Sequence, residues 1–173
     1  MMAAKLKQIQ LLLLDVDGVL TAGEIVYADS GEQLKIFNVK DGLGIRLLKE
    51  AGLQVGIITG RSGKALRHRC TNLGIDLIFD GTHDKALALP EIEERTGVAA
   101  SQTAFIGDDL PDLAIMKRVG LAIAVADAHE LVRNTAHMVT RASGGRGAVR
   151  EASEMILKAQ DRWDELMDKL FNG

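Results

Sequence analysis

The sequence of 173 residues contains a single cysteine, Cys70, and no long apolar segment. One cysteine cannot form an intramolecular disulfide, and it excludes a metal site built from several cysteines. The apolar runs are far shorter than the roughly 20 residues that a membrane-spanning helix needs. The first ten residues contain two lysines but no apolar core followed by a cleavage site, so we expect a cytoplasmic protein.

The sequence also lacks an excess of charge of either sign. Lysine and arginine together number 21, aspartate and glutamate 24, and the net charge is −3 without a basic cluster. This balance argues against nucleic acid as the main partner. With 47% hydrophobic and 26% charged residues, the composition is that of an ordinary globular protein, and we expect one domain over residues 1–173.

Residues 11–20, LLLLDVDGVL, are the most informative stretch of the sequence. Four consecutive leucines predict a strand that is buried on both faces, as in a parallel sheet. Asp15 and Asp17 follow directly, and burying a charge is costly unless it is paired or binds a metal. The carboxyl ends of strands in α/β sheets are also where ligands bind. The pair therefore indicates either a cation site or, more simply, a polar Asp-Gly turn.

Strand and helix patterns alternate over most of the chain. Apolar β-prone segments occupy residues 9–14, 54–58, 75–79, 103–106 and 121–125, with an edge strand at 138–139. Amphipathic helical segments lie between them. This alternation predicts an α/β fold, a Rossmann-like three-layer αβα arrangement with a central parallel sheet.

Two segments depart from the alternation. Residues 23–39 contain two β-prone stretches around a polar Ser-Gly turn, which predicts an inserted β-hairpin. Residues 147–170 predict one long C-terminal helix, in which apolar residues recur at spacings of three and four, namely Val149, Ala152, Ile156, Ala159, Trp163, Leu166 and Leu170. This stripe indicates a helix packed on its own domain or, alternatively, a subunit interface.

Polar side chains follow four of the predicted strands: Asp15 with Asp17, Thr59, Lys85, and Asp108 with Asp109. Because parallel strands end at one edge of a sheet, these groups can converge. Carboxylates from two strand ends suit magnesium, and a lysine and a threonine supply donors for a phosphoryl group. One carboxylate can attack phosphorus and form an acyl phosphate, while a second transfers the proton. The set predicts hydrolysis of a phosphate monoester.

The ordered set resembles the four motifs of the haloacid dehalogenase superfamily. The resemblance rests on Asp15-Val16-Asp17-Gly18, then Thr59, then Lys85, then Gly107-Asp108-Asp109-Leu110-Pro111-Asp112. It implies that Asp15 is the nucleophile, that Asp17 is the acid/base, and that Thr59 and Lys85 bind phosphate. It also implies that magnesium is held by Asp15, the backbone carbonyl of Asp17, and Asp108, with Asp109 and Asp112 orienting these ligands.

Members of this superfamily usually carry a large cap domain, and this chain has room only for the hairpin. The segments FNVKDG (37–42) and GGRGAVRE (144–151) resemble the capless phosphatases of 3-deoxy-D-manno-octulosonate 8-phosphate, over almost the whole chain. This resemblance implies hydrolysis of that ester through an aspartyl-phosphate intermediate, in lipopolysaccharide precursor synthesis. It also implies a homotetramer in which hairpins and C-terminal segments of neighbouring subunits complete each active site.

The same resemblance implies the residues that bind the substrate. By position these are Asp17, Asn38, Val39, Lys40, Asp41, Gly42, Arg46, Arg61, Arg69 and Lys85. Arginines suit a sugar acid, because a guanidinium binds a carboxylate through two hydrogen bonds. Arg61 favours the eight-carbon ester over 2-keto-3-deoxynononate 9-phosphate, whose phosphatases tend to carry glutamate there. Whether Lys64 and residues 144–147 touch the site stays open.

Two alternatives accompany this reading. The first is the nine-carbon phosphatase. The second is a receiver-type signalling domain, which also places aspartate, threonine and lysine around magnesium and is phosphorylated on the aspartate that ends its third strand, here Asp80. In a receiver domain, however, Asp17, Asp108 and Asp109 would have no role.

Overall fold

The computed structural model describes residues 2–172. Its centre is a six-stranded parallel sheet in the order β5-β4-β1-β6-β7-β8. The strands are β1 (Leu11–Leu14), β4 (Gln54–Ile58), β5 (Leu77–Phe79), β6 (Thr103–Gly107), β7 (Leu121–Ala124) and β8 (Met138–Val139). The predicted α/β fold with a parallel sheet is confirmed, including the edge strand at 138–139.

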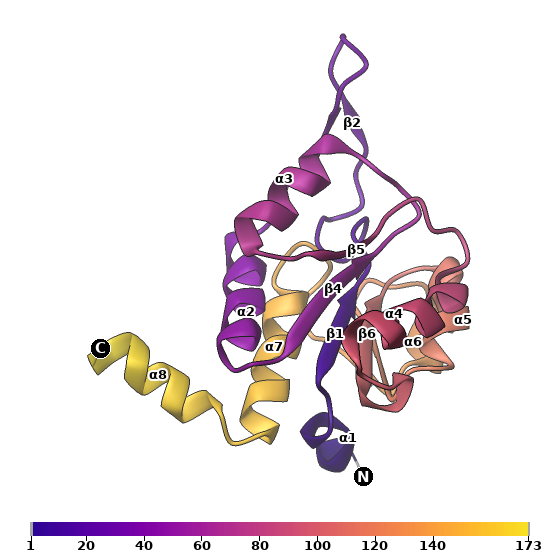
Figure 1. Cartoon of the computed structure of the whole chain (residues 1–173). Helices are drawn as coiled ribbons and strands as arrows, with labels where there is room; N and C mark the ends of the chain where they lie inside the picture. The colour runs from indigo at the N-terminus through magenta and orange to yellow at the C-terminus, as the bar shows by residue number, and fades with distance from the viewer. Residues whose placement is uncertain (1, 173) are drawn as a thin grey trace.

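Helices cover both faces of the sheet (Figure 1). On one face lie α2 (Val39–Glu50), α3 (Lys64–Leu73) and α7 (Ala148–Ala159), and α2 packs against α7. On the other face lie α4 (Leu89–Thr96), α5 (Leu113–Met116) and α6 (Glu130–Thr135). Short 3-10 helices precede α4, β6 and α5, namely η1 (Lys85–Ala88), η2 (Ala100–Gln102) and η3 (Leu110–Asp112).

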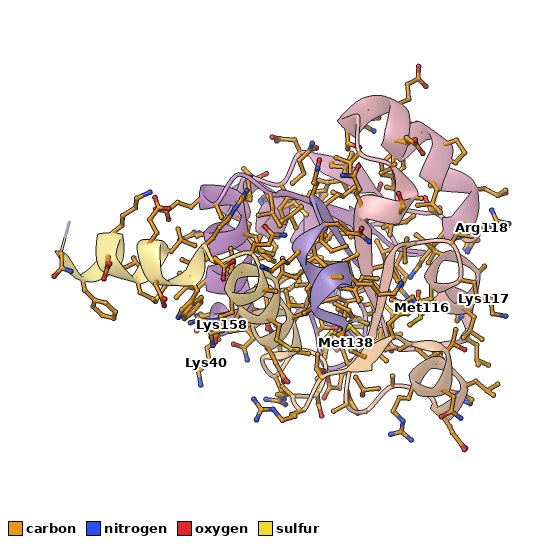
Figure 2. All side chains as sticks on the ribbon, turned by 90° about the horizontal axis from the view of Figure 1, so that it is seen from below. Lys40, Met116, Lys117, Arg118, Met138 and Lys158 are labelled. Carbon is orange, nitrogen blue, oxygen red and sulfur yellow. The ribbon has the colours of Figure 1, made fainter. Side chains whose placement is uncertain are left out.

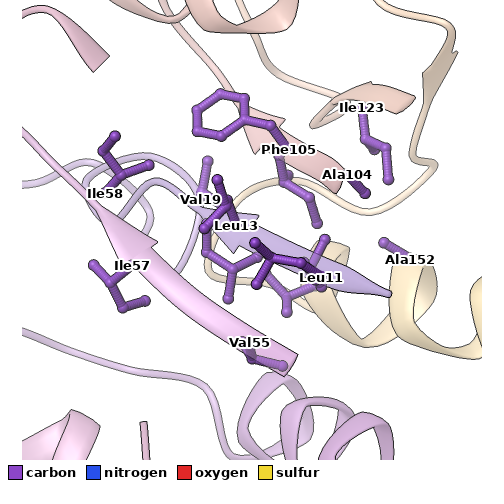
Figure 3. Packing of buried hydrophobic residues seen from close by; sticks show 14 of the residues in the cluster. Leu11, Leu13, Val19, Val55, Ile57, Ile58, Ala104, Phe105, Ile123 and Ala152 are labelled. Carbon is purple, nitrogen blue, oxygen red and sulfur yellow. The ribbon is translucent and has the colours of Figure 1, made fainter. Parts of the chain in front are cut away.

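The four leucines of β1 occupy the centre of the core. Each of them is 0% exposed, and β1 pairs with β4 on one side and with β6 on the other. Figure 3 shows Leu11 and Leu13 among Val55, Ile57 and Phe105 of these neighbouring strands. Because successive side chains of a strand point to opposite faces, burial of all four requires layers on both sides. The prediction of a strand buried on both faces is confirmed.

The segment before β1 was not predicted to be helical. Residues Met2–Lys7 form α1, whose Leu6 is buried and whose Lys5 Nζ donates a hydrogen bond to the carbonyl of Gly120 over 2.8 Å. A six-residue helix is too short to show a clear apolar period, so its stability comes from these tertiary contacts.

The inserted hairpin is present but its strands are short. They are β2 (Val26–Tyr27) and β3 (Gln33–Leu34), which pair antiparallel and form a sheet of their own. In Figure 1 the hairpin projects from the end of the domain at which β1 finishes, opposite to α1.

The predicted single C-terminal helix over 147–170 is wrong. The chain forms α7 and then α8 (Trp163–Asn172), because α7 ends in a Schellman turn: Arg162 N–H donates to the carbonyl of Leu157 over 3.0 Å, and Asp161 N–H to that of Lys158 over 3.1 Å. Asp161 adopts φ 59°, a conformation that usually calls for glycine. The spacing of apolar residues continues from α7 into α8, so the sequence pattern does not reveal the break between the two helices.

The two helices differ in how they use the apolar stripe. Val149, Ala152 and Ile156 of α7 are fully buried on their own domain. In contrast α8 projects from the body of the molecule in two perpendicular views (Figures 1 and 2), and its Leu170 and Phe171 are 54% and 81% exposed. Packing on the chain's own domain therefore explains the first half of the stripe.

Candidate active site

The sheet topology brings the predicted site residues to one edge. Asp15, Thr59 and Asp108 follow directly after β1, β4 and β6, which are neighbours in the sheet. The N–H of Asp15 continues the strand pairing by donating to the carbonyl of Ile106 over 3.1 Å. The chain order reverses beside β1, and such a switch point leaves a crevice at the carboxyl ends of the strands.

A cavity of about 470 Å³ occupies this crevice. Its lining includes all four of the predicted motifs and both aspartates of the first one. The lining residues are Asp15, Asp17, Gly23, Ile25, Thr59, Gly60, Arg61, Thr82, His83, Lys85, Asp108, Asp109, Pro111 and Asp112.

Asp15 is held in a buried charge network with Lys85. The Lys85 ammonium lies 2.9 Å from Asp15 Oδ1 and 2.6 Å from Asp112 Oδ1, and all three side chains are largely buried. Asp15 Oδ1 also accepts the Val16 N–H over 2.7 Å. Burial raises the pKa of Asp15 to about 6, because the effect of desolvation exceeds that of the neighbouring lysine. Asp15 is therefore fixed in orientation, with Lys85 beside it.

Asp112 serves as the link between the acidic loop and Lys85. Its second oxygen, Oδ2, accepts the N–H groups of Asp108 over 2.9 Å and of Asp109 over 3.3 Å, while Asp109 caps η3 by accepting the Leu110 N–H. With both of its oxygens engaged, Asp112 orients the loop that carries Asp108.

Asp108 has an incomplete set of partners. Its Oδ1 is buried without a hydrogen-bond partner in the part of the chain that the structure describes. The carboxyl group lies against Gly18, where a Cβ would come within 2.0 Å of Asp108 Oδ2, so only glycine fits there. Burial and the neighbouring carboxylates of Asp15 and Asp112 raise the pKa of Asp108 to about 8. Among the described residues the Asp108 carboxyl group therefore has no ion-pair partner that would stabilise its ionised form, and a bound cation would supply one.

These residues fit a divalent cation. Oxygens of Asp15, Asp108 and Asp112 lie within 4.8 Å of one another. Since Asp112 is occupied by Lys85 and by backbone amides, Asp15 and the unpartnered Asp108 are the groups that could bind the ion. Hard oxygen ligands from two strand ends suit magnesium, which keeps part of its water shell.

Asp17, Thr59 and Arg61 also line the cavity. Thr59 is buried at the end of β4, and its N–H donates to the carbonyl of Phe79 on β5 over 2.9 Å. Arg61 Nε lies 3.9 Å from Asp17 Oδ2, and Lys35 of the hairpin forms an ion pair with Asp17 Oδ1. Asp17 is thus partly exposed toward the cavity, with a cation beside each of its oxygens.

Several residues that the resemblance implied as substrate ligands do not line this cavity in the described part of the chain. Asp41 is fully buried and accepts the N–H groups of Gly147 over 3.2 Å and of Arg150 over 2.9 Å, so it caps α7 from a neighbouring helix. Val39 and Lys40 are exposed at the start of α2, and Arg46 donates from the surface to the carbonyl of Asn72.

Asn38 and Arg69 also have internal partners. Arg69 Nη2 donates to the carbonyl of Asn38 over 3.0 Å, and Asn38 Nδ2 donates to that of Gly145 over 3.2 Å. Gly42 gives space to Arg69, since a Cβ there would lie 2.4 Å from Nη2. Within one chain these residues anchor the loop that precedes α7.

That loop, residues 144–147, supports the site from behind. A Cβ on Gly144 would come within 1.7 Å of the Gly18 carbonyl oxygen, and the Gly145 N–H donates to the carbonyl of Val19 over 2.8 Å. The glycines let this loop pack on the backbone that follows Asp17. Lys64, whose position the sequence left open, is exposed and lines a separate groove between the hairpin and α3.

The sequence did not single out several residues at the site. Thr82 and His83 line the cavity because the Thr82 N–H donates to the carbonyl of Thr59 and turns the loop inward. Lys35 was missed as well, although a lysine between two apolar residues, Leu34 and Ile36, breaks the pattern of a hairpin strand.

The comparisons with known proteins agree with this geometry. The model of the family described as haloacid dehalogenase-like hydrolase matches residues 74–151. The chain is 48% identical to 3-deoxy-D-manno-octulosonate 8-phosphate phosphatase KdsC of Escherichia coli K12 over 162 residues. These aligned residues cover 94% of this chain and 86% of that protein. The chain belongs to the haloacid dehalogenase-like hydrolases. The family resemblance predicted from the sequence is confirmed.

Solved structures of haloacid dehalogenase-like hydrolases share the fold along nearly the whole chain. The Yersinia pestis 3-deoxy-D-manno-octulosonate 8-phosphate phosphatase is 48% identical with a TM-score of 0.92, covering 94% of this chain and 88% of that one. The Moraxella catarrhalis enzyme, solved with magnesium, phosphate and KDO, is 42% identical with a TM-score of 0.94, covering 97% of each chain.

Magnesium is expected to stabilise the chain more strongly as the pH rises. The pKa values of Asp108, about 8, and Asp15, about 6, lie above the ~3.9 of an unfolded aspartate. The folded chain therefore binds more protons than the unfolded chain. The stabilisation that these protons give to the folded chain is lost as the pH rises from about 4 through about 8. A bound cation replaces these protons, so its affinity increases over the same interval. Thermal unfolding with and without magnesium, at about pH 6 and about pH 8, measures the effect.

We expect the larger magnesium-dependent increase in Tm at the higher pH. Asp108→Asn should lose the increase at both pH values, while the exposed control Asp76→Asn keeps it. A wild-type increase that does not depend on pH would contradict the assignment of Asp15 and Asp108 as ligands.

Proposed function

We propose that the chain is a magnesium-dependent phosphatase that hydrolyses 3-deoxy-D-manno-octulosonate 8-phosphate to the free sugar acid and phosphate. One observation carries the proposal: the buried Asp15, with Lys85 2.9 Å away, lies beside the unpartnered Asp108 in an open cavity. The relatives named for this activity cover most of the chain, and one of their structures holds magnesium, phosphate and KDO together.

In this proposal Asp15 and Asp17 divide the chemistry. An Asp15 oxygen attacks phosphorus, and the bond between phosphorus and the sugar oxygen breaks. Asp17 acts as the general acid that gives a proton to that oxygen, and then as the general base that takes a proton from the water that attacks the aspartyl phosphate and releases phosphate. Asp17 lines the cavity two residues after the nucleophile, in a position suited to both transfers.

The remaining residues bind and orient the phosphoryl group. Lys85 and Thr59 line the cavity together with Asp15 and donate to the phosphoryl oxygens. Asp15, the Asp17 carbonyl and Asp108 would hold magnesium, which would supply positive charge to stabilise the phosphoryl group. Asp112 and Asp109 keep the ligand loop in place through the hydrogen bonds described above.

The receiver-type alternative finds no support in the geometry. Asp80, which would be phosphorylated in such a domain, forms two hydrogen bonds with Arg67, over 2.6 and 3.2 Å. It is not among the described residues that line the cavity.

Replacing Asp15 by Asn is expected to lower the release of phosphate from the octulosonate ester by about 10⁴-fold or more, because the nucleophile is lost. Colorimetric assay of phosphate, with and without magnesium, measures this loss. The matched control, Asp76→Asn, should retain wild-type turnover. Wild-type turnover by the Asp15 variant would overturn the assignment of the nucleophile.

Wild-type kcat/KM should be higher for the eight-carbon ester than for 2-keto-3-deoxynononate 9-phosphate, since Arg61 lines the cavity.

We also propose that the enzyme works as a homotetramer in the cytoplasm, with the hairpin and neighbouring residues of one subunit completing the site of another. Apolar side chains of the hairpin face outward: Tyr27 is 64% and Ile36 79% exposed, and Val39 of the adjoining helix is 80% exposed. Such a cluster on a projecting element is typical of an interface. A neighbouring subunit would bring in residues that lie outside this chain's own cavity and are at least partly exposed, namely Asn38, Val39, Lys40, Arg46 and Arg69. Asp41 and Gly42 are buried in their own subunit, so they would support these residues and not contact the substrate.

Light scattering of the purified protein is expected to give the mass of a tetramer. Tyr27→Glu combined with Ile36→Glu should yield smaller species with little activity, because charge is placed in the apolar contact. Leu131→Glu, on a leucine of α6 that is 54% exposed, is the control and should leave the tetramer intact. A catalytically competent monomer would rule the shared site out.

A further inference from the structure

Lys35, which follows β3 directly, faces inward where the alternation of a hairpin would place an apolar side chain. Its side chain is 5% exposed, whereas those of its neighbours point outward, Leu34 being 52% and Ile36 79% exposed. Alternate residues of an extended chain face opposite sides, so the hairpin directs its apolar side chains to solvent and its lysine toward the domain. Burying an ammonium group without a partner is costly, and an inward-facing lysine therefore requires an anion.

That anion is Asp17, the second aspartate of the first motif. Lys35 forms an ion pair with Asp17 Oδ1, while Arg61 lies beside Oδ2. Asp15, two residues earlier, is paired with Lys85 instead. Each aspartate of the motif thus has its own lysine, one from the body of the domain and one from the hairpin.

We propose that Lys35 is a positioning residue for the acid/base Asp17, an inference that rests on the proposed phosphatase function. Asp17 follows β1 in a loop and, in contrast to Asp15, has no hydrogen bond from a neighbouring backbone amide in the described structure. The lysine holds the Asp17 carboxyl at the mouth of the cavity, where it reaches the sugar oxygen that leaves phosphorus. The hairpin thereby contributes to proton transfer within its own subunit, besides forming contacts between subunits.

The pair is more than a surface ion pair. Exposed ion pairs contribute little because both side chains stay mobile in water. Here the lysine stem is enclosed between the hairpin and α3, where it lines the groove that also contains Gln33, Ser62 and Lys64. The enclosure restricts the ammonium to one place, and this restriction fixes the carboxylate with which it pairs.

The test compares two esters that differ in their need for an acid. Release of the sugar alkoxide requires a proton from Asp17, whereas p-nitrophenolate is a stable leaving group and requires none. We expect Lys35→Met to lower kcat/KM for the octulosonate ester by about 10- to 100-fold, the range for a misplaced catalytic group, and to leave kcat/KM for p-nitrophenyl phosphate nearly unchanged. Lys35→Arg should restore part of the loss, and the exposed control Lys117→Met should resemble the wild type.

A double-mutant cycle separates positioning from other roles. In an Asp17→Asn background, Lys35→Met should cause no further loss, because the group that it positions is gone. A further loss of the same size would show an independent substrate contact, and an equal loss on both esters with a lowered Tm would show a structural anchor. Either result, or a fully active Lys35→Met enzyme, overturns the inference. A wild-type protein that hydrolyses neither ester, or an active Asp15→Asn variant, overturns the proposed function instead.

Discussion

The structure depends on how carboxylate charge is held at the carboxyl ends of β1 and β6. Parallel pairing of these central strands places Asp15 and Asp108 side by side, and Asp112 is drawn in by its hydrogen bonds to the same loop. Burial raises the pKa values of Asp15 and Asp108, and the neighbouring carboxylates add to this because Lys85 supplies one ammonium among three acidic groups. The apolar strand beneath holds these carboxyl groups in place, and their concentration favours binding of a cation.

Residues 2–172 contain no large cap domain, so the hairpin is the element that covers the site from the carboxyl end of the sheet. It projects from the carboxyl end of the sheet, carries exposed apolar side chains outward and directs Lys35 inward to Asp17. Behind the site, residues 144–147 pack on the Gly18 carbonyl and are tied to α2 through Asp41 and Asn38. The loop that carries Asp17 is therefore supported from the hairpin on one side and from α7 on the other.

The periodic and motif-based features could be predicted from the sequence, and the non-local ones could not. β4 has the predicted bounds of 54–58, and the four strand-end motifs share one cavity, because buried strands and parallel edges follow simple rules. The break at Asp161 escaped detection because aspartate rarely ends a helix in the left-handed conformation. The capping of α7 by Asp41 and the ion pair of Lys35 could not be predicted, because the partners lie far along the chain, at residues 147–150 and at Asp17.

We expect Asp15 to carry the phosphoryl group during turnover. The direct measurement is to quench the enzyme in acid during hydrolysis of the sugar-acid ester, treat it with hydroxylamine, and locate the resulting hydroxamate by peptide mass spectrometry. Hydroxylamine converts an acyl phosphate into a hydroxamate at the carboxyl group that held it. We predict the hydroxamate on Asp15, in wild-type enzyme with magnesium and substrate, and none without substrate. Turnover without any modified carboxyl group, or with the hydroxamate on Asp17, would contradict the account.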